Sequence, residues 1–345
     1  MIVRWKLGIV VAGALALAGC SGETGPSDTP NDDGLPPMPE FPDNPTTPGG
    51  VDLGRRLFHD PVLSGDGTQS CADCHRQAFA FGDPRQFSFG IHGDAGTRNA
   101  STIVNPAWQT SQFWDGRAAT LEDQAVSPVQ NPIEMAADWS VVVAAVAADP
   151  DYPAAFAAAF GTSEVTQERI VRAIAQFERG FVSADSKFDR ERRGEVAFSA
   201  AEIRGRDLFF SEEAECFHCH AAPLFTDGRF HDIGLDLDPP DEGRAAATGV
   251  VFDRGKFKTP SLRNVEVSAP YMHDGRFATL EEVLDHYAAG IQRSPNLDPV
   301  LGVQLNGGAT GLGFTPEQRA DLIAFLKALT DPSFLQNPDL GPPSS

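Results

Sequence analysis

Two short cysteine and histidine motifs contain the residues best suited to chemistry in this sequence. Each has the pattern Cys-x-x-Cys-His, formed once by Cys71, Cys74 and His75 and again by Cys216, Cys219 and His220. In this pattern two thiols can bond to the vinyl groups of one haem while the imidazole reaches the iron. A lone Cys-x-x-Cys is also typical of half a zinc site or of a redox dithiol. The sequence has no third cysteine pair for zinc to use, so we predict two covalently attached haems c.

The segments around the two motifs repeat. Residues 53–58 (LGRRLF) and 204–209 (RGRDLF) precede the two motifs. After them, Arg98-Asn99 and residues 113–122 resemble Arg263-Asn264 and residues 273–281, and each copy has a threonine, Thr120 or Thr279, placed to cap a helix. Internal repetition of this kind indicates two related haem domains in series.

The elements that must position these motifs are predicted to be helices. After Thr166 an apolar stripe at helical spacing predicts a linking helix. Ser199 with Glu202 indicates a helix leading to Cys216, and Thr315-Pro316 begins a C-terminal helix that we expect to lie against the second haem. No long alternating strand pattern occurs. The predicted fold is mainly α, with two cytochrome c-like haem domains in tandem and long loops.

The N-terminal segment resembles an export signal. Arg4 and Lys6 precede the apolar run 7–18, which is too short to span a bilayer, and Cys20 ends a stretch that resembles a bacterial lipoprotein cleavage box. An ordinary secretory signal cut nearby is the alternative. We predict a periplasmic protein held by a lipid on Cys20, with Ser21 compatible with the outer membrane. The predicted segments are a signal peptide (1–20), a disordered tether (21–50), an N-terminal haem domain (51–183), a C-terminal haem domain (184–333) and a flexible tail (334–345).

The charge of the chain limits its partners. The formal net charge is −21, which disfavours nucleic acid and favours a basic or dipolar protein partner. The only membrane contact predicted is the N-terminal lipid.

The second axial ligand of each haem decides between electron carrier and catalyst. For the second haem the candidates are Met272, His273, His286 and Tyr287. For the first they are His92, Met135 or no protein ligand at all. The residues alone do not choose among them.

Beyond the haem motifs, several long segments are similar to the bacterial di-haem cytochrome c peroxidase and MauG superfamily. The resemblance covers about residues 51–331. It is carried by Arg98-Asn99, residues 113–117, Gln124, Pro128, Glu134-Met135, residues 258–264 and residues 271–275. It implies that Glu134 is the acid-base group of the first haem, that Gln124 is its polar neighbour, and that Trp114 relays electrons between the haems.

The resemblance also implies a calcium site and two departures from common cytochrome c peroxidases. The calcium ligands would be Asn99 and the backbone carbonyl groups of Ser268 and Pro270, completed by water. Ile91, with His92 beside it, stands where those peroxidases place a removable distal histidine, so the first haem is expected to be open. Tyr287 stands where they place an axial methionine, as in MauG, with Met272 and His286 in reserve. A hard, anionic phenolate favours ferric and higher iron states.

Three hypotheses for function follow. The favoured one is a peroxidase that reduces hydrogen peroxide at the first haem, with electrons from a small c-type cytochrome or a cupredoxin. The second, suggested by Tyr287, is MauG-like oxidation of a tryptophan or another side chain of a protein substrate. The third is a non-enzymatic electron carrier with both irons closed. Many relatives are dimers, so the resemblance also admits a homodimer.

Overall fold

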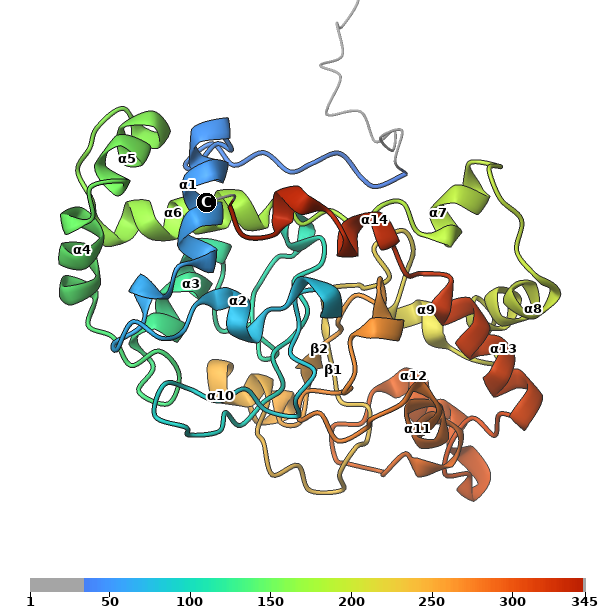
Figure 1. The fold of residues 1–345 in the computed structure, drawn as a ribbon. Helices are drawn as coiled ribbons and strands as arrows, with labels where there is room; N and C mark the ends of the chain where they lie inside the picture. The colour runs from blue at the N-terminus through green and yellow to red at the C-terminus, as the bar shows by residue number, and fades with distance from the viewer. Residues whose placement is uncertain (1–33, 344–345) are drawn as a thin grey trace, which may run out of the picture.

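The computed structural model of the chain describes residues 34–343. Within that range helices are joined by long loops, and the strands form one small antiparallel sheet (Figure 1). In this sheet β1 (Phe230–His231) pairs with β2 (Phe257–Lys258). The prediction of a mainly α fold is confirmed.

The helices of the N-terminal half surround one hydrophobic core. Phe58, Phe177 and Phe181 meet edge to face there, with ring centroids 5.5 Å apart for Phe58 and Phe177 and 4.9 Å apart for Phe177 and Phe181. The helices of this half are α1 (Pro48–His59), α2 (Cys71–Cys74), α3 (Leu121–Gln130), α4 (Trp139–Ala148), α5 (Tyr152–Phe160) and α6 (Gln167–Glu178).

The C-terminal half has a second core, in which Phe188, Phe225 and Phe325 pack together. The first core draws mainly on residues up to Phe181 and the second on residues from Phe188 onward, on either side of the division expected at residues 183 and 184. The helices of this half are α7 (Lys187–Arg192), α8 (Ala200–Phe209), α9 (Cys216–Cys219), α10 (Arg244–Thr248), α11 (Leu280–Asp285), α12 (Pro299–Gln304) and α13 (Pro316–Lys327). The last helix, α14 (Pro332–Leu335), returns to the N-terminal core.

Each half contains the same close crossing of two helices. α1 packs against α6, and α8 packs against α13. A Cβ atom on Gly54 would lie 1.9 Å from the carbonyl oxygen of Ala173, and one on Gly205 would lie 1.9 Å from that of Asp321. Only glycine allows such an approach. The glycine shared by the repeated segments 53–58 and 204–209 therefore has one role in both halves.

The predicted helix caps are confirmed. Thr120, Ser199, Thr279 and Thr315 each accept a hydrogen bond from the backbone N–H three residues further on. Thr166, which was not predicted to be a cap, does the same for the linking helix. Such a bond satisfies a donor that has no partner inside the helix. These side chains fix where the helices beside both haem motifs begin.

A duplicated turn precedes α3 and α11. The backbone N–H of Gln112 donates to the carbonyl of Ala118, and that of Tyr271 donates to the carbonyl of Phe277, both over 2.8 Å. The next residues, Phe113 and Met272, both have a positive φ, 67° and 73°. Trp114 and His273 follow them and are thus equivalent positions in the two halves.

The register of the duplication differs from the one read from the sequence. Asn105 and Asn264, with φ of 50° and 62°, begin equivalent 3-10 turns, Pro106–Trp108 and Val265–Val267. Each asparagine lies nine residues before the equivalent pair Trp114 and His273. The pairing of Arg98-Asn99 with Arg263-Asn264 was therefore wrong, because an Arg-Asn dipeptide occurs by chance at two non-equivalent positions.

Both predicted flexible ends are wrong for the residues that the structure describes. Leu35 is fully buried, and the carbonyl of Asn44 accepts a hydrogen bond of 2.6 Å from Arg179, although 21–50 was predicted to be a tether. Phe334 and Leu340 join the N-terminal core, although 334–345 was predicted to be a tail. Proline-rich composition suggested disorder, but a few apolar and amide side chains bind these segments to the domain. The predicted signal peptide and Cys20 lie outside the described residues.

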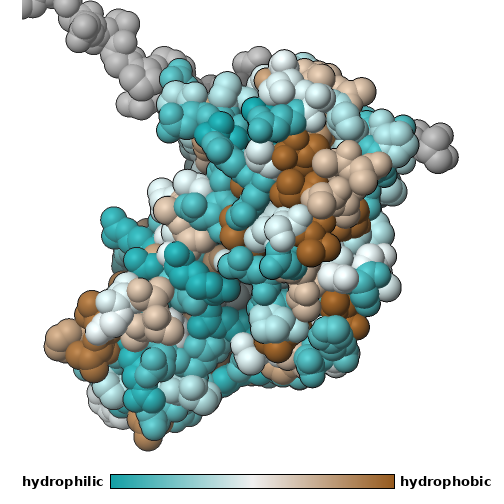
Figure 2. Space-filling model, turned by 90° about the vertical axis from the view of Figure 1, so that its left-hand side faces the viewer, coloured by the Kyte–Doolittle hydropathy of each residue, from teal (hydrophilic) through white to brown (hydrophobic). Residues whose placement is uncertain are grey.

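Within residues 34–343 no single helix is long and apolar enough to cross a membrane, and the two that reach that length together, α4 and α5, are bent by 102°. They lie on the left in Figure 1, and Figure 2 shows that face, with hydrophobic residues gathered in its upper part. The inward side chains of both helices, such as Val146 and Phe156, are fully buried. These helices therefore belong to the N-terminal core.

Candidate active site

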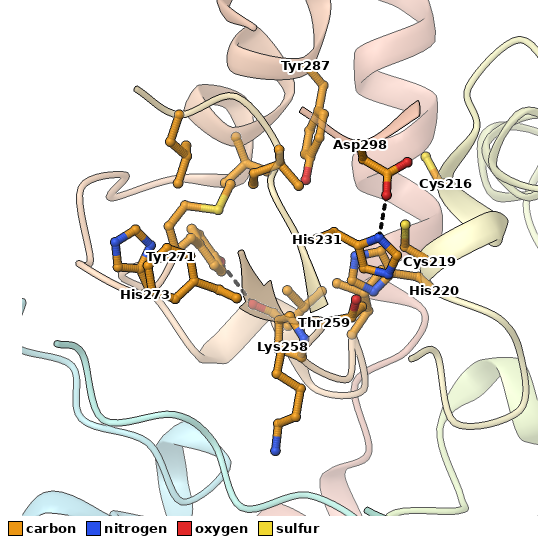
Figure 3. Close-up of a pocket in the computed structure, with 18 of the residues that line it drawn as sticks. Cys216, Cys219, His220, His231, Lys258, Thr259, Tyr271, His273, Tyr287 and Asp298 are labelled. Carbon is orange, nitrogen blue, oxygen red and sulfur yellow. Dashed lines mark hydrogen bonds and ion pairs between the residues drawn. The ribbon is translucent and has the colours of Figure 1, made fainter. Parts of the chain in front are cut away.

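The second cysteine motif lies in a cavity of about 220 Å³ in the C-terminal half (Figure 3). Cys216, Cys219 and His220 line it. The Nδ1 atom of His220 hydrogen-bonds to the carbonyl oxygen of Phe225 over 3.1 Å. Burial lowers the pKa of His220 to about 4, so the ring is neutral and its Nε2 atom can bind a metal.

The first cysteine motif lies in a larger cavity of about 910 Å³ in the N-terminal half. Cys71, Cys74 and His75 line it. The Nδ1 atom of His75 hydrogen-bonds to the carbonyl oxygen of Phe81 over 2.7 Å, and burial lowers the pKa of His75. The two histidines thus have the same orientation in both halves.

The donor groups in both cavities fit a covalently bound haem. All four motif cysteines are free, so their sulfur atoms are available for thioether bonds. In each cavity the motif histidine is a neutral imidazole oriented through its Nδ1 atom. The walls are largely apolar in the C-terminal cavity, where Leu284, Leu322 and Leu326 take part. Leu322 and Leu326 belong to α13, the helix predicted to lie against the second haem.

Tyr287 and Met272 both line the C-terminal cavity. The hydroxyl end of Tyr287 points into it (Figure 3), and burial raises the pKa of this phenol. Tyr287 belongs to a π-helical turn, His286–Gly290, a form that often occurs at functional sites. The reserve ligand His286 is not among the lining residues, because its ring turns away and its Nε2 hydrogen-bonds to the carbonyl of Ile233 over 3.0 Å.

Glu134 and Gln124 line the N-terminal cavity together with His75. The Nδ2 atom of Asn131 donates a hydrogen bond of 2.7 Å to the Glu134 carboxylate. Burial nevertheless raises the pKa of Glu134. His92, considered as a ligand of the first haem, is exposed and is not among the residues that line this cavity. Together with Gly90 and Ile91, it belongs to a loop whose tip faces solvent.

Trp114 lines both cavities. Its indole Nε1 donates a hydrogen bond of 2.9 Å to the carbonyl oxygen of Asn99. The carbonyl of Trp114 accepts one of 2.7 Å from the backbone N–H of Lys258. The predicted position of Trp114, between the two haem motifs, is thus the wall that the cavities share.

Known proteins resemble the chain over nearly its whole length. A family model for di-haem cytochrome c peroxidase matches residues 48–197. The methylamine utilization protein MauG of Methylorubrum extorquens is 35% identical, over 99% of this chain and 98% of that protein. The cytochrome c551 peroxidase of Nitrosomonas europaea is 36% identical, over 81% of this chain and 79% of that protein. The chain belongs to the di-haem cytochrome c peroxidase and MauG family.

A solved structure of this family has the same fold. The crystal structure of a MauG-like protein associated with microbial copper homeostasis superposes with a TM-score of 0.83 at 39% identity, covering 90% of this chain and 97% of that one. Membership of the di-haem family implies two haems c, as the two cysteine motifs predict.

The residues expected to bind calcium in this family also lie together. Asn99, Ser268 and Pro270 all line the C-terminal cavity. The Nδ2 atom of Asn99 donates to the carbonyl oxygens of Arg85 over 3.0 Å and Gln86 over 3.3 Å. Because the amide nitrogen of Asn99 donates to these carbonyl groups, its amide oxygen is the atom that remains to bind a cation.

Sequence reasoning missed a second carboxyl group in the N-terminal cavity. Glu178, on α6, lines this cavity and is 4% exposed. Its Oε2 atom has no hydrogen-bond partner among residues 34–343. Burial, and then the charge of Glu122, raise its pKa to about 8. Glu178 falls on the apolar stripe predicted for this helix, and a charged residue at such a position is the signal that was available.

The C-terminal cavity also contains a charged imidazole. His231 lines the cavity, and its Nδ1 atom lies 2.7 Å from a carboxylate oxygen of Asp298 (Figure 3). Its Nε2 atom lies 2.9 Å from a carboxylate oxygen of Asp227. These two carboxylates raise the pKa of His231 to about 11. Both ring nitrogens are held by carboxylates, so neither is available to ligate iron.

Proposed function

We propose that the protein is a di-haem c-type peroxidase that reduces hydrogen peroxide in the N-terminal cavity. Electrons would enter from a small redox protein, a c-type cytochrome or a cupredoxin, and pass through the C-terminal cavity and Trp114. The observation that carries this proposal is the wall that Trp114 forms between the two haem cavities, with Glu134 facing only the N-terminal one. Two haem cavities that differ in this way would separate the peroxide chemistry from the supply of electrons.

The haems would supply iron centres that exchange electrons with peroxide and with the donor. The chain itself manages the protons. Reducing one peroxide to two waters takes two electrons and two protons. The Glu134 carboxyl group is suited to take a proton from one oxygen of hydrogen peroxide and to return it to the other oxygen, which leaves as water. Because burial raises its pKa, the Glu134 carboxylate is a stronger base for the first of these two transfers.

Replacing Glu134 by glutamine tests this role. The amide keeps the size and the contact with Asn131 but cannot transfer a proton. We expect peroxide to bind while its cleavage slows by roughly 10²- to 10⁴-fold. Glu164→Gln is a matched control, because Glu164 is exposed and paired with Arg169 outside both cavities. Unchanged kinetics in Glu134→Gln would reject the assignment.

A second candidate function is the oxidation of a side chain of a partner protein. Tyr287 favours it, because an axial phenolate would stabilise oxidised iron in the C-terminal cavity. Steady peroxide turnover with reduced cytochrome c as the donor would support the peroxidase. Peroxide use only in the presence of a protein substrate would favour the second function. An electron carrier would use no peroxide in either assay.

The cellular location, the calcium site and the oligomeric state of the enzyme are also proposals. Export to the periplasm and a lipid on Cys20 are supported by the leader sequence, and mass spectrometry of the purified mature protein would test them. Calcium at Asn99, Ser268 and Pro270 is supported by their shared cavity wall. A homodimer is proposed from the family resemblance alone, and analytical ultracentrifugation would test it.

A further inference from the structure

The duplicated register pairs Asn99 with a lysine. Asn99 lies fifteen residues before Trp114, and Lys258 lies fifteen residues before His273. The backbone contacts agree with this pairing. The N–H of Asn99 donates to the carbonyl of His273, and the N–H of Lys258 donates to the carbonyl of Trp114, both over 2.7 Å. The two halves thus exchange one reciprocal pair of hydrogen bonds at the wall between the cavities.

The same register relates the other two proposed calcium ligands to the partners of Lys258. Ser268 and Pro270 lie five and three residues before His273. Their equivalents, five and three residues before Trp114, are Gln109 and Ser111. The Nζ atom of Lys258 donates a hydrogen bond of 2.7 Å to Oε1 of Gln109 and another of 2.7 Å to the carbonyl oxygen of Ser111. The two sites differ in one ligand atom. Gln109 contributes its side-chain oxygen, whereas Ser268 would contribute its backbone carbonyl oxygen.

The surroundings of Lys258 keep its side chain in the charged ammonium form. Both oxygens that it contacts are acceptors, so the lysine must donate. The nearby carboxylate of Asp115 is already bound by Arg98 over 2.6 Å and by Arg117 over 3.0 Å. Burial lowers the pKa of Lys258 to about 8, and the charge of Asp115 opposes this shift. The ammonium form therefore still predominates at neutral pH.

Lys258 lines both cavities. Its two acceptors, Gln109 and Ser111, precede Trp114 on one loop. We infer that the Lys258 ammonium group takes the place of a metal cation at the N-terminal equivalent of the proposed calcium site. There it holds the loop of Trp114 and places a positive charge between the haems. Lys258 is thus a positioning residue for electron transfer. The comparison with the C-terminal copy rests on the proposed calcium site, whereas the contacts of Lys258 do not.

The reduction potentials of the two haems test the charge. A positive charge beside both cavities stabilises the reduced, less positive iron. In the haem-loaded protein with calcium chelated, Lys258→Met should shift both midpoint potentials downward, and Lys258→Arg should retain them. Lys327→Met is the matched control, because Lys327 is 52% exposed at the end of α13, outside both cavities, and solvent screens its charge.

Lys258→Gln provides a second neutral variant if Lys258→Met does not load haem. Unchanged potentials in the neutral variants would overturn the inference, as would an equal shift in Lys258→Arg. These titrations require no peroxide turnover and no bound calcium. Failure of the peroxidase or calcium proposals would therefore be distinguishable from failure of this one.

Chemical rescue tests the positioning role. In haem-loaded Lys258→Ala, the amides of residues 109–114 should exchange hydrogen faster than in the unmodified protein. Added propylammonium ion should restore their protection, because it returns a cation to the same acceptors. Propanol, which has a similar length and no charge, should not. Equal recovery with propanol, or no loss of protection in Lys258→Ala, would contradict the role.

Discussion

The indole nitrogen of Trp114 donates a hydrogen bond of 2.9 Å to the backbone carbonyl of Asn99. This bond fixes the ring in the wall between the two haem cavities. The acceptor is a neutral carbonyl and therefore a weak base. An oxidised indole would keep its proton against such an acceptor, which suits a residue that passes an electron and returns to its starting state.

Trp114→Phe should slow electron transfer between the haems. Phenylalanine keeps an aromatic ring in the wall but is harder to oxidise and lacks the N–H. The first reaction with peroxide, in the N-terminal cavity, should proceed at an unchanged rate. Stopped-flow absorbance of each haem would separate the two steps. Trp108→Phe is the control, because Trp108 lies outside both cavities and donates to Pro36 and Pro37. Equal transfer rates in both variants would exclude Trp114 as the relay.

Tyr287→Phe should change the ligation of the second haem, whereas Met272→Leu should not. Both side chains line the C-terminal cavity, so the geometry admits either. Loss of a phenolate ligand would favour ferrous iron and raise the potential of this haem. The ferric absorption spectrum and a redox titration would detect the change. The opposite pattern, with an effect of Met272→Leu alone, would assign the ligand to methionine.

Glu178 should make stability depend on pH. Its pKa is raised from 4.5 to about 8, so between these values the folded protein holds a proton that the unfolded chain releases. Its contribution to the unfolding free energy therefore falls as the pH rises through this window. Glu178→Gln should show a shallower decline in denaturant titrations at pH 5 to 8. Glu168→Gln, exposed on the same helix, should follow the unmodified protein, and identical curves for all three would refute the prediction.

The buried ion pair between Arg263 and Asp189 should be critical for stability. Two hydrogen bonds of 2.7 and 2.8 Å join them, and both side chains are at most 1% exposed. Arg263→Met would leave a buried carboxylate unpaired, which costs about 3–5 kcal/mol. The half-exposed Arg190 is the control, and its replacement should cost about 0–1 kcal/mol. Chemical denaturation would measure both. A loss below about 1 kcal/mol in Arg263→Met would show that the carboxylate finds another partner.

Local signals in the sequence predicted much of this site. Cys-x-x-Cys-His is a local covalent motif, and threonine caps such as Thr120 act within four residues, so both could be read from short segments. Glu134 and Trp114 were assigned only through the family resemblance. The contacts of Lys258 with Gln109 and Ser111 join segments about 150 residues apart, and nothing in the intervening sequence indicates them. The burial of Leu35 and Leu340 likewise depends on a surface that exists only after folding.

The most direct test of a peroxidase with one open haem is the spectrum of the ferric protein before and after one equivalent of hydrogen peroxide. We predict one five-coordinate or water-bound iron and one six-coordinate iron at rest, and changes at both haems after peroxide. Two six-coordinate irons that peroxide leaves unchanged would contradict the account, and the protein would then be an electron carrier.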